Sequence, residues 1–330
     1  MTMRLALLLA TIVGLGIAAW VLGSHGLGPV IDAMERIGPW GFATLCLWSI
    51  GVLAILGVAL HVVAPGEPAR RIGRFIWSRA TREAATDVLP FSQFGGLLVG
   101  ARTLEQGGVP RPVVHAALIA DLTTEMASQV LFTMFGVAML ATTLVNQNAA
   151  AAVRPTILVG AALCVAIMIA FALFQRPALA VAGRIGEHLL PGVGAAAAEV
   201  RARLDLVYRH RLRVIAGFLI NLVAWAVSAT GAWIALRFMG LDISLWAVLV
   251  IESLIFALRS AAFMLPGAIG VQEAAYLLLA PLFGLDPASA VALSLLKRGR
   301  DLALGVPSLA IWQISEGTRL WRRRTGQQGA

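Results

Sequence analysis

The chain has 330 residues, with 26 Lys or Arg against 17 Asp or Glu, so only 13% carry a charge, whereas about a quarter do in soluble domains. Apolar residues make up 59% and the mean hydropathy is +0.84, which excludes an ordinary soluble enzyme and a disordered chain. The net charge of +9 does not indicate nucleic-acid binding, because the basic residues cluster between apolar segments, as they do in membrane proteins.

Apolar segments recur along the chain at lengths near the roughly 20 residues that cross a bilayer as a helix. The first could be a signal peptide, but it is long and no clear cleavage site precedes Ser24, so we interpret it as an uncleaved helix. The pattern predicts an all-α, polytopic integral membrane protein with about eight transmembrane helices in one domain, residues 1–330. The predicted spans are 5–22, 41–63, 113–144, 155–175, 214–238, 245–265, 270–283 and 287–314.

Arginines are unevenly shared between the segments that join these spans. Segments 65–111 and 176–213 hold seven each, and the C-terminal tail holds four more. The opposite loops hold only Arg36 and Arg154. Since positively charged loops stay in the cytoplasm, we expect a multi-pass protein of the bacterial inner membrane with both termini cytoplasmic. Both termini on one side require an even number of spans, which favours eight.

Segment 70–89 has the pattern of a basic amphipathic helix. Arg71, Arg74, Ser78 and Arg82 fall on one face at helical spacing, and apolar residues fall on another. Two interpretations stay open: a helix that lies on anionic lipid headgroups, and a solvated linker helix. Segment 195–214 shows a weaker version of the pattern.

Ionisable residues inside the apolar spans are the main functional signal. Each would cost roughly 3 kcal/mol if it faced lipid at mid-depth, so most must face the protein interior or a wet cavity. Asp121, Glu125 and Gln129 share one helix face, and Lys297 and Arg298 could each pair with Asp301 within one helix. These charges either line a polar cavity or form ion pairs that fix helix packing. They are Asp121, Glu125, Arg237, Glu252, Arg259, Glu273, Lys297, Arg298, Arg300 and Asp301, of which Arg237 lies near a span end and should snorkel.

Two apolar segments are broken by a similar Leu-Pro and glycine pattern. The first contains Pro90, Gly95 and Gly96, and the second contains Pro266, Gly267 and Gly270. We interpret them as re-entrant elements at matching positions of a weak internal repeat, in direct or inverted orientation, which in transporters indicates the binding site. We expect segments 88–106 and 265–284 to lie near each other and to face the charged helices. Ordinary connecting turns are the alternative.

Metal and cofactor chemistry finds little support in the sequence. Cys46 and Cys164 lie within apolar runs and are interpreted as small hydrophobic residues. The five histidines are scattered without zinc-ligand spacing, and we find neither a Walker motif nor a nucleophile elbow. We therefore expect no cofactor, no bound metal and no catalytic residue.

At the charged residues and the proline-glycine segments described above, the chain resembles the lysylphosphatidylglycerol synthase transmembrane region, a flippase-like membrane family, and most closely its hopanoid-biosynthesis-associated members. The resemblance covers most of the chain from about residue 70 onward. Many relatives carry a Glu soon after the first proline-glycine element, where this chain has Leu97. The resemblance is carried by Pro90, Gly95-Gly96, Gly100-Ala101-Arg102, Asp121-Leu122-Thr123-Thr124-Glu125, Ser128-Gln129, Leu258-Arg259-Ser260, Pro266-Gly267, Gly270-Val271-Gln272-Glu273, Ser294-Leu295-Leu296-Lys297-Arg298 and Trp312-Gln313.

The resemblance implies re-entrant elements and a role in lipid translocation. It does not imply lipid aminoacylation, which belongs to a separate soluble domain, and the chain ends at Ala330 without one. The leading hypothesis is an inner-membrane flippase or transporter that moves a hopanoid-type lipid or a phospholipid through a polar cavity without ATP. The alternatives are an intramembrane lipid-modifying enzyme and a scaffold for a lipid-biosynthesis complex.

The expected partners are the lipid substrate, anionic headgroups at the basic cytoplasmic segments and lipid-biosynthesis proteins. The expected substrate-binding residues are Asp121, Glu125, Gln129, Glu252, Arg259, Gln272, Glu273, Lys297, Arg298 and Asp301.

Overall fold

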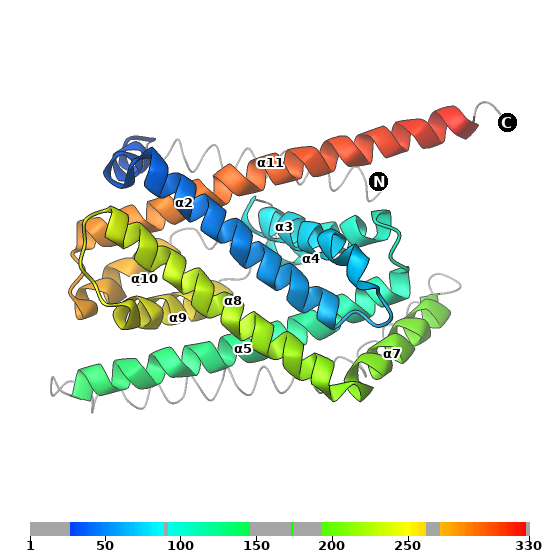
Figure 1. Ribbon diagram of the computed structural model, residues 1–330, viewed down its shortest axis with the longest axis horizontal. Helices are drawn as coiled ribbons and strands as arrows, with labels where there is room; N and C mark the ends of the chain where they lie inside the picture. Colours follow the sequence, from blue (N-terminus) through cyan, green and yellow to red (C-terminus); the bar gives the residue numbers. More distant parts are fainter. Residues whose placement is uncertain (1–26, 89–91, 146–172, 174–192, 262–270, 328–330) are drawn as a thin grey trace.

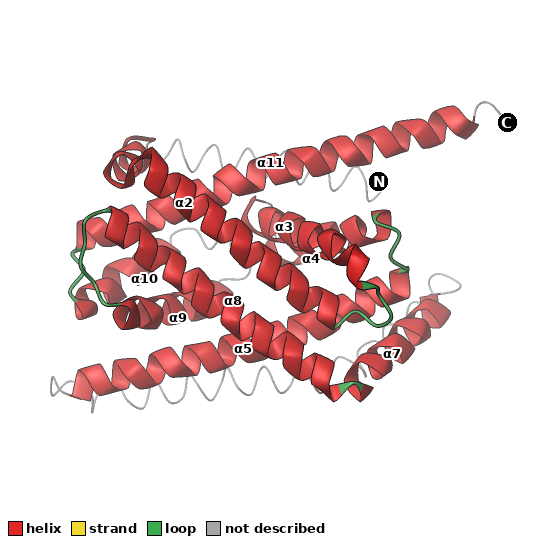
Figure 2. Ribbon diagram, in the orientation of Figure 1, coloured by secondary structure: helices red, strands yellow, loops and turns green. Residues whose placement is uncertain are grey.

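The computed structural model describes residues 27–88, 92–145, 173, 193–261 and 271–327, and these residues form helices joined by short turns, without a strand among them (Figures 1 and 2). The all-α prediction is therefore confirmed. The elements are α2 (Leu27–Val62), η1 (Ala69–Arg71), α3 (Ile72–Val88), α4 (Ser92–Gln106), α5 (Arg111–Val145), α7 (Val193–Arg209), α8 (Arg211–Phe238), α9 (Leu245–Ala261), α10 (Val271–Leu279), η3 (Ala280–Phe283) and α11 (Pro287–Gln327).

Six of the predicted spans fall on described helices: α2, α5, α8, α9, α10 with η3, and α11. The spans predicted at 5–22 and 155–175 lie outside the described residues, apart from Leu173. Helix α2 contains a kink, because Gly38 has a φ of 71° and Pro39 follows it. Proline has no backbone N–H to donate, so a straight α-helix does not run through this point.

The long helices pass each other in opposite directions. Helix α2 packs along α8, which in turn packs on α5, and the Trp48 indole N–H donates to the Val227 carbonyl at 2.7 Å across the α2–α8 contact. In Figure 1 the end of α2, the starts of α5 and α8 and the end of α11 all lie toward the right, and the opposite helix ends lie toward the left. Helices α2 and α11 thus run in one direction and α5 and α8 in the other, all within one layer.

Large apolar side chains are exposed on the outer helix faces. On α8, Leu212, Ile215, Leu219 and Val223 are exposed at helical spacing and form one apolar stripe. Among the described residues, Glu35–Val62 and Arg211–Phe238 are long and apolar enough to cross a membrane, each with 28 residues. Such a stripe is typical of a surface that contacts lipid rather than water.

Two three-helix units share one plan. Helices α3 and α9 each have 17 residues and are followed by a short helical element and then by the long helix α5 or α11. Before each long helix a glycine with positive φ caps the short element, Gly108 at 79° and Gly284 at 82°. Each glycine N–H donates three residues back, and the next residue donates five residues back, which is the Schellman arrangement. Helices α5 and α11 run in opposite directions in Figure 1, as the matching helices of an inverted repeat would.

The predicted basic face of α3 is exposed near the start of the helix, at Arg74, but is buried further along. Both interpretations of segment 70–89 require exposed basic side chains, but Ser78 and Arg79 are 0% exposed and Arg82 is 3% exposed. The reason is tertiary: α3 is enclosed by α2, α4 and α11, and its arginines find carboxylates on α5. The interpretations of α3 as a membrane-surface helix and as a solvated linker are therefore wrong for Ser78 and Arg82, whereas Arg74 is exposed.

The first predicted re-entrant element begins a regular helix. Gly95 and Gly96 lie in the first turns of α4, which packs closely on α3. A Cβ atom at Gly96 would lie 2.1 Å from Thr86 Oγ1 and 2.7 Å from the Arg82 carbonyl oxygen, so only glycine permits this approach. The predicted residues Pro90, Pro266, Gly267 and Gly270 lie outside the described residues.

Candidate functional site

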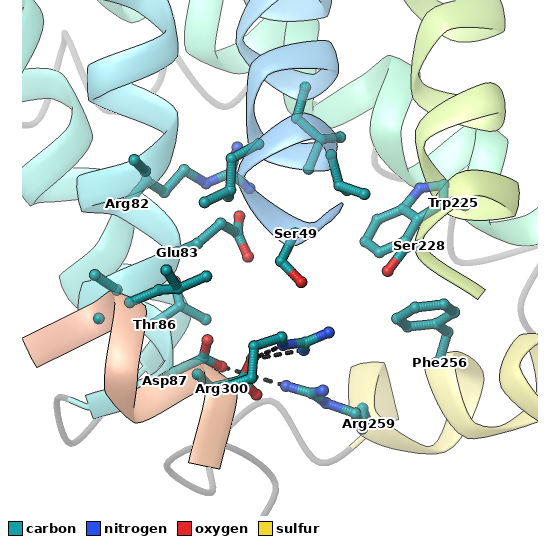
Figure 3. Close-up of a pocket in the computed structure, with 18 of the residues that line it drawn as sticks. Ser49, Arg82, Glu83, Thr86, Asp87, Trp225, Ser228, Phe256, Arg259 and Arg300 are labelled. Atoms are coloured by element: carbon teal, nitrogen blue, oxygen red, sulfur yellow. Dashed lines mark hydrogen bonds and ion pairs between the residues drawn. The ribbon is translucent and has the colours of Figure 1, made fainter. Parts of the chain in front are cut away.

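A cavity of about 180 Å³ lies between the two repeat units and the helices α2 and α8 (Figure 3). Its walls come from α3 and α5 of the first unit and from α9 and α11 of the second, so neither unit forms it alone. The lining mixes both signs of charge with hydroxyl groups and two aromatic rings. The polar and aromatic lining residues are Ser49, Arg82, Glu83, Thr86, Asp87, Glu125, Gln129, Trp225, Ser228, Phe256, Arg259, Ser260, Arg300, Asp301 and Ser308.

A buried ionic cluster between α3 and α5 forms one wall. The Arg79 guanidinium donates to Glu125 at 2.5 Å and to Asp121 at 3.2 Å. Arg82 donates to the same two carboxylates, at 2.9 Å to Glu125 and 3.2 Å to Asp121. Arg79 also pairs with Glu83, one turn further along α3, at 3.0 Å. Two arginines are thus shared among three carboxylates, and Arg82, Glu83 and Glu125 reach the cavity surface.

A second ionic contact joins the two units across the cavity. Arg259, near the end of α9, donates to Asp87, near the end of α3, at 3.2 Å. Both side chains are 21% exposed, more than those of the α3–α5 cluster. On α11, Arg300 donates to the neighbouring Asp301 at 2.6 Å. Figure 3 shows Asp87, Arg259 and Arg300 gathered at one end of the cavity.

A third cluster is buried between α9, α10 and α11, away from the cavity surface. The Lys297 ammonium donates to Glu252 at 2.5 Å and to the Tyr276 hydroxyl at 2.9 Å, and that hydroxyl donates to Glu252. The ammonium also lies 5.6 Å from the centroid of the Phe256 ring, whose side chain lines the cavity. This cluster lies directly behind the aromatic wall.

The remaining predicted site residues form a fourth group, between α10 and α11. Arg298 pairs with Glu273 at 2.5 Å, and the Gln272 amide donates to Ser294 at 2.9 Å. The expected pairing of Lys297 and Arg298 with Asp301 within α11 is wrong. Both cations instead find acids on neighbouring helices, because tertiary contacts place carboxylates closer than the next turn of α11 does.

The predicted site is therefore only partly brought together. Glu125, Gln129, Arg259 and Asp301 line the cavity, and Asp121 lies directly behind it. The other five, Glu252, Gln272, Glu273, Lys297 and Arg298, belong to the third and fourth groups and are not lining residues.

Sequence reasoning missed several lining residues on α3. Arg82, Glu83 and Asp87 were assigned to a surface or linker segment, because α3 as a whole is too polar to resemble a membrane span. A usable signal existed in their spacing: Arg79, Arg82 and Glu83 recur three and four residues apart on one helix face. Arg300 was noted as an intramembrane charge but not assigned to the site. Arg237, which was left out, pairs with Asp242 at 2.6 Å on the exposed end of α8.

No group of three or more His, Cys, Asp or Glu side chains in the described part of the chain is arranged to hold a metal ion. A comparison with protein families does return a match: the model of the lysylphosphatidylglycerol synthase transmembrane region aligns with residues 6–307, which is most of the chain. The chain belongs to this family. No curated protein and no solved structure matches the chain significantly.

Membership in the lysylphosphatidylglycerol synthase transmembrane family establishes a membrane protein related to lipids. It agrees with the apolar stripe on α8 and with the two helices that are long enough to span a bilayer. The family description covers the transmembrane region of a synthase, so it distinguishes neither lipid movement from lipid synthesis nor one lipid from another.

Proposed function

We propose that this protein moves a lipid between the leaflets of the bacterial inner membrane, with the headgroup passing through the cavity between the two repeat units. The single observation that carries the proposal is the position of this cavity. It lies between the two units, whose long helices α5 and α11 run in opposite directions, and both units contribute charged walls. In transporters built from inverted repeats the substrate site lies at this interface.

The size and polarity of the cavity fit a headgroup rather than a whole lipid. Pockets that enclose drug-sized ligands occupy about 300–1,000 Å³. The cavity of about 180 Å³ has room for a headgroup, while the acyl chains would remain in the bilayer. Charged walls inside the membrane lower the cost of moving a polar group across the hydrocarbon, which is the barrier that makes unassisted flipping slow.

The transport proposed is not driven by ATP, since the sequence holds no Walker motif, and involves no chemical change of the lipid. The substrate is a phospholipid or a hopanoid-type lipid. The exposed basic residues of the cytoplasmic segments would contact anionic headgroups. The N- and C-termini are proposed to face the cytoplasm.

A reconstitution assay tests the proposal. The purified full-length chain is placed in vesicles that carry a phospholipid labelled on an acyl chain, and dithionite then bleaches the probe in the outer leaflet. We expect the inner-leaflet probe to be bleached as well, at a rate that rises with protein content. Mass spectrometry of the extracted lipids serves as the second measurement. A chemically modified lipid would support an enzyme instead. If the lipid neither moves nor is modified, a scaffold role is the function that remains.

A further inference from the structure

The charges that line the cavity are divided between its walls. Helix α3 contributes the carboxylates of Glu83 and Asp87, whereas the facing helix α9 contributes the guanidinium of Arg259. Figure 3 shows Glu83 and Asp87 on the α3 side and Arg259 on the α9 side. We call the exposed carboxylates of α3 the acidic side and Arg259 on α9 the basic side. Arg82, the other lining charge of α3, is only 3% exposed, and α11 contributes one charge of each sign, Arg300 and Asp301.

Each charged lining residue already has a partner of opposite sign among the described residues. Glu83 shares its partner Arg79 with Asp121 and Glu125, so that group has one acid more than it has bases. A ligand that binds Asp87 or Arg259 through a single charge would leave the other of the two uncompensated in a poorly hydrated site. The pairs are Arg82 with Glu125 at 2.9 Å, Arg259 with Asp87 at 3.2 Å, Arg300 with Asp301 at 2.6 Å, and Glu83 with Arg79 at 3.0 Å.

Three of these side chains have spare hydrogen-bonding capacity toward the cavity. The Asp87 and Arg259 side chains are each 21% exposed, and that of Glu83 is 30% exposed. A guanidinium has five N–H donors and a carboxylate about four acceptor sites, and the Arg259–Asp87 contact uses one of each. Free donors therefore remain on Arg259 and free acceptors on Asp87 and Glu83.

We propose that the cavity selects a zwitterionic lipid headgroup that carries a phosphate and a primary ammonium. The inference rests on the proposed transport function and narrows its substrate. The phosphate accepts hydrogen bonds from Arg259 on α9, and the ammonium donates to Asp87 and Glu83 on α3. Such a headgroup replaces the Asp87–Arg259 contact with two contacts of the same kind, so no charge is left uncompensated.

Other headgroup classes fit less well. An anionic headgroup competes with Asp87 for Arg259 and brings a like charge to the acidic side. A cationic headgroup without phosphate leaves Arg259 without its partner. An uncharged polyol headgroup cannot replace the charged partner of Asp87 or of Arg259, so it enters only while the Asp87–Arg259 ion pair stays intact.

The test uses the full chain in vesicles with four acyl-labelled probes: phosphatidylethanolamine, phosphatidylglycerol, a diacyl trimethylammonium lipid and glucosylceramide. We expect phosphatidylethanolamine to cross at least about tenfold faster than each of the other three. Equal rates for all four probes would overturn the headgroup inference while leaving lipid movement intact. If no probe moves, the proposed function itself is wrong.

A variant sharpens the test. Glu83→Gln removes one carboxylate from the acidic side, while Arg79 keeps Glu125 and Asp121 as partners. We expect the preference for phosphatidylethanolamine over phosphatidylglycerol to fall by about threefold or more. The matched control is Glu199→Gln on the exposed face of α7, which makes the same charge change away from the cavity and should leave the preference unchanged. An unaltered preference in Glu83→Gln would overturn the inference.

Discussion

The guanidinium of Arg259 donates a hydrogen bond to the carboxylate of Asp87 at 3.2 Å, across 172 positions of the chain. The two residues lie near the ends of α9 and α3, the corresponding 17-residue helices of the two repeat units. Both line the cavity and are partly exposed, so in the proposed transport a headgroup would separate the units at this contact.

Breaking this pair should stop lipid movement without unfolding the protein. We expect Asp87→Asn and Arg259→Gln each to slow flipping by about tenfold or more, which corresponds to roughly 1.4 kcal/mol in the barrier. The reversed pair, Asp87→Arg with Arg259→Asp, should recover part of the rate. Reconstituted vesicles give the measurement, and monodispersity in detergent checks folding. Wild-type rates in both single variants would show that the pair only fixes packing.

Arg79 should be a stability residue, in contrast to Arg259. It is fully buried and contacts three carboxylates, so Arg79→Ala leaves the buried acids Asp121 and Glu125 with Arg82 as their one base and removes the base that Glu83 contacts. We expect a loss of about 3–5 kcal/mol, measured as a lower unfolding temperature in detergent. The control is Arg237→Ala, whose partner Asp242 is 87% exposed and which should cost less than about 1 kcal/mol. Similar losses in both variants would contradict the interior role of Arg79.

The predicted topology can be tested by labelling single cysteines after Cys46 and Cys164 are replaced. Ser78, within the first arginine-rich segment, is unsuitable because it is buried, whereas Ala69 and Ala198 are exposed. We expect Ala69→Cys and Ala198→Cys to react only from the cytoplasmic side. Asp242→Cys, at the other end of α8, should react only from the periplasmic side. Labelling of Ala69→Cys and Asp242→Cys from the same side would refute the topology.

Gly96 should tolerate no side chain. A Cβ atom there would clash with Thr86 Oγ1 and with the Arg82 carbonyl oxygen, and the backbone oxygen cannot rotate away. We expect Gly96→Ala to lower stability by about 1–3 kcal/mol through overpacking. Gly73→Ala is the matched control, because a Cβ atom at Gly73 meets nothing within 4 Å. Thermal unfolding of both variants in detergent is the measurement.

Asp286 caps α11 outside the membrane spans. Its carboxylate accepts a hydrogen bond from the Ser289 backbone N–H at 2.9 Å, and hydrogen bonds from Ser289 hold the pKa of Asp286 below its usual range. A lowered pKa in the folded state means that this stabilisation is present above the pKa of the unfolded chain and is lost as the pH falls through the folded value. We expect Asp286→Ala to destabilise the protein by about 0.5–1 kcal/mol near neutral pH.

The variant Asp286→Asn separates capping from charge. Asparagine also caps helices, so most of the stability at neutral pH should remain, whereas the acid-dependent loss contributed by this position should disappear. Unfolding temperatures measured across the acidic range compare the two variants with the wild type. An identical acid dependence in wild type and Asp286→Asn would show that the cap does not titrate.

Much of the helical layout could be predicted from the sequence. Apolar runs of the required length indicated α5 and α8, and their few charges indicated inward-facing groups such as Asp121 and Glu125. The recurring Leu-Pro and glycine pattern also suggested a repeat, and the matching caps at Gly108 and Gly284 support it. These features are local, since chain spacing and hydropathy alone set them.

The partners of each charge could not be predicted in this way. Sequence spacing suggested that Lys297 pairs with Asp301 in its own helix, but Glu252 on α9 lies 2.5 Å from it. Spacing likewise suggested a surface position for Arg82, which is buried against Glu125.

Composition and periodicity by themselves determined the class of protein, the membrane-spanning runs and the need for an internal polar site. Only the tertiary structure decided that α3 is buried, which charges pair, and that Asp87 and Arg259 meet at a cavity between two units. The physical reason is that hydropathy reports how each residue interacts with its solvent, lipid or water, along the chain. A buried charge is instead neutralised by whichever helix the fold packs against it, and that choice depends on contacts between distant segments.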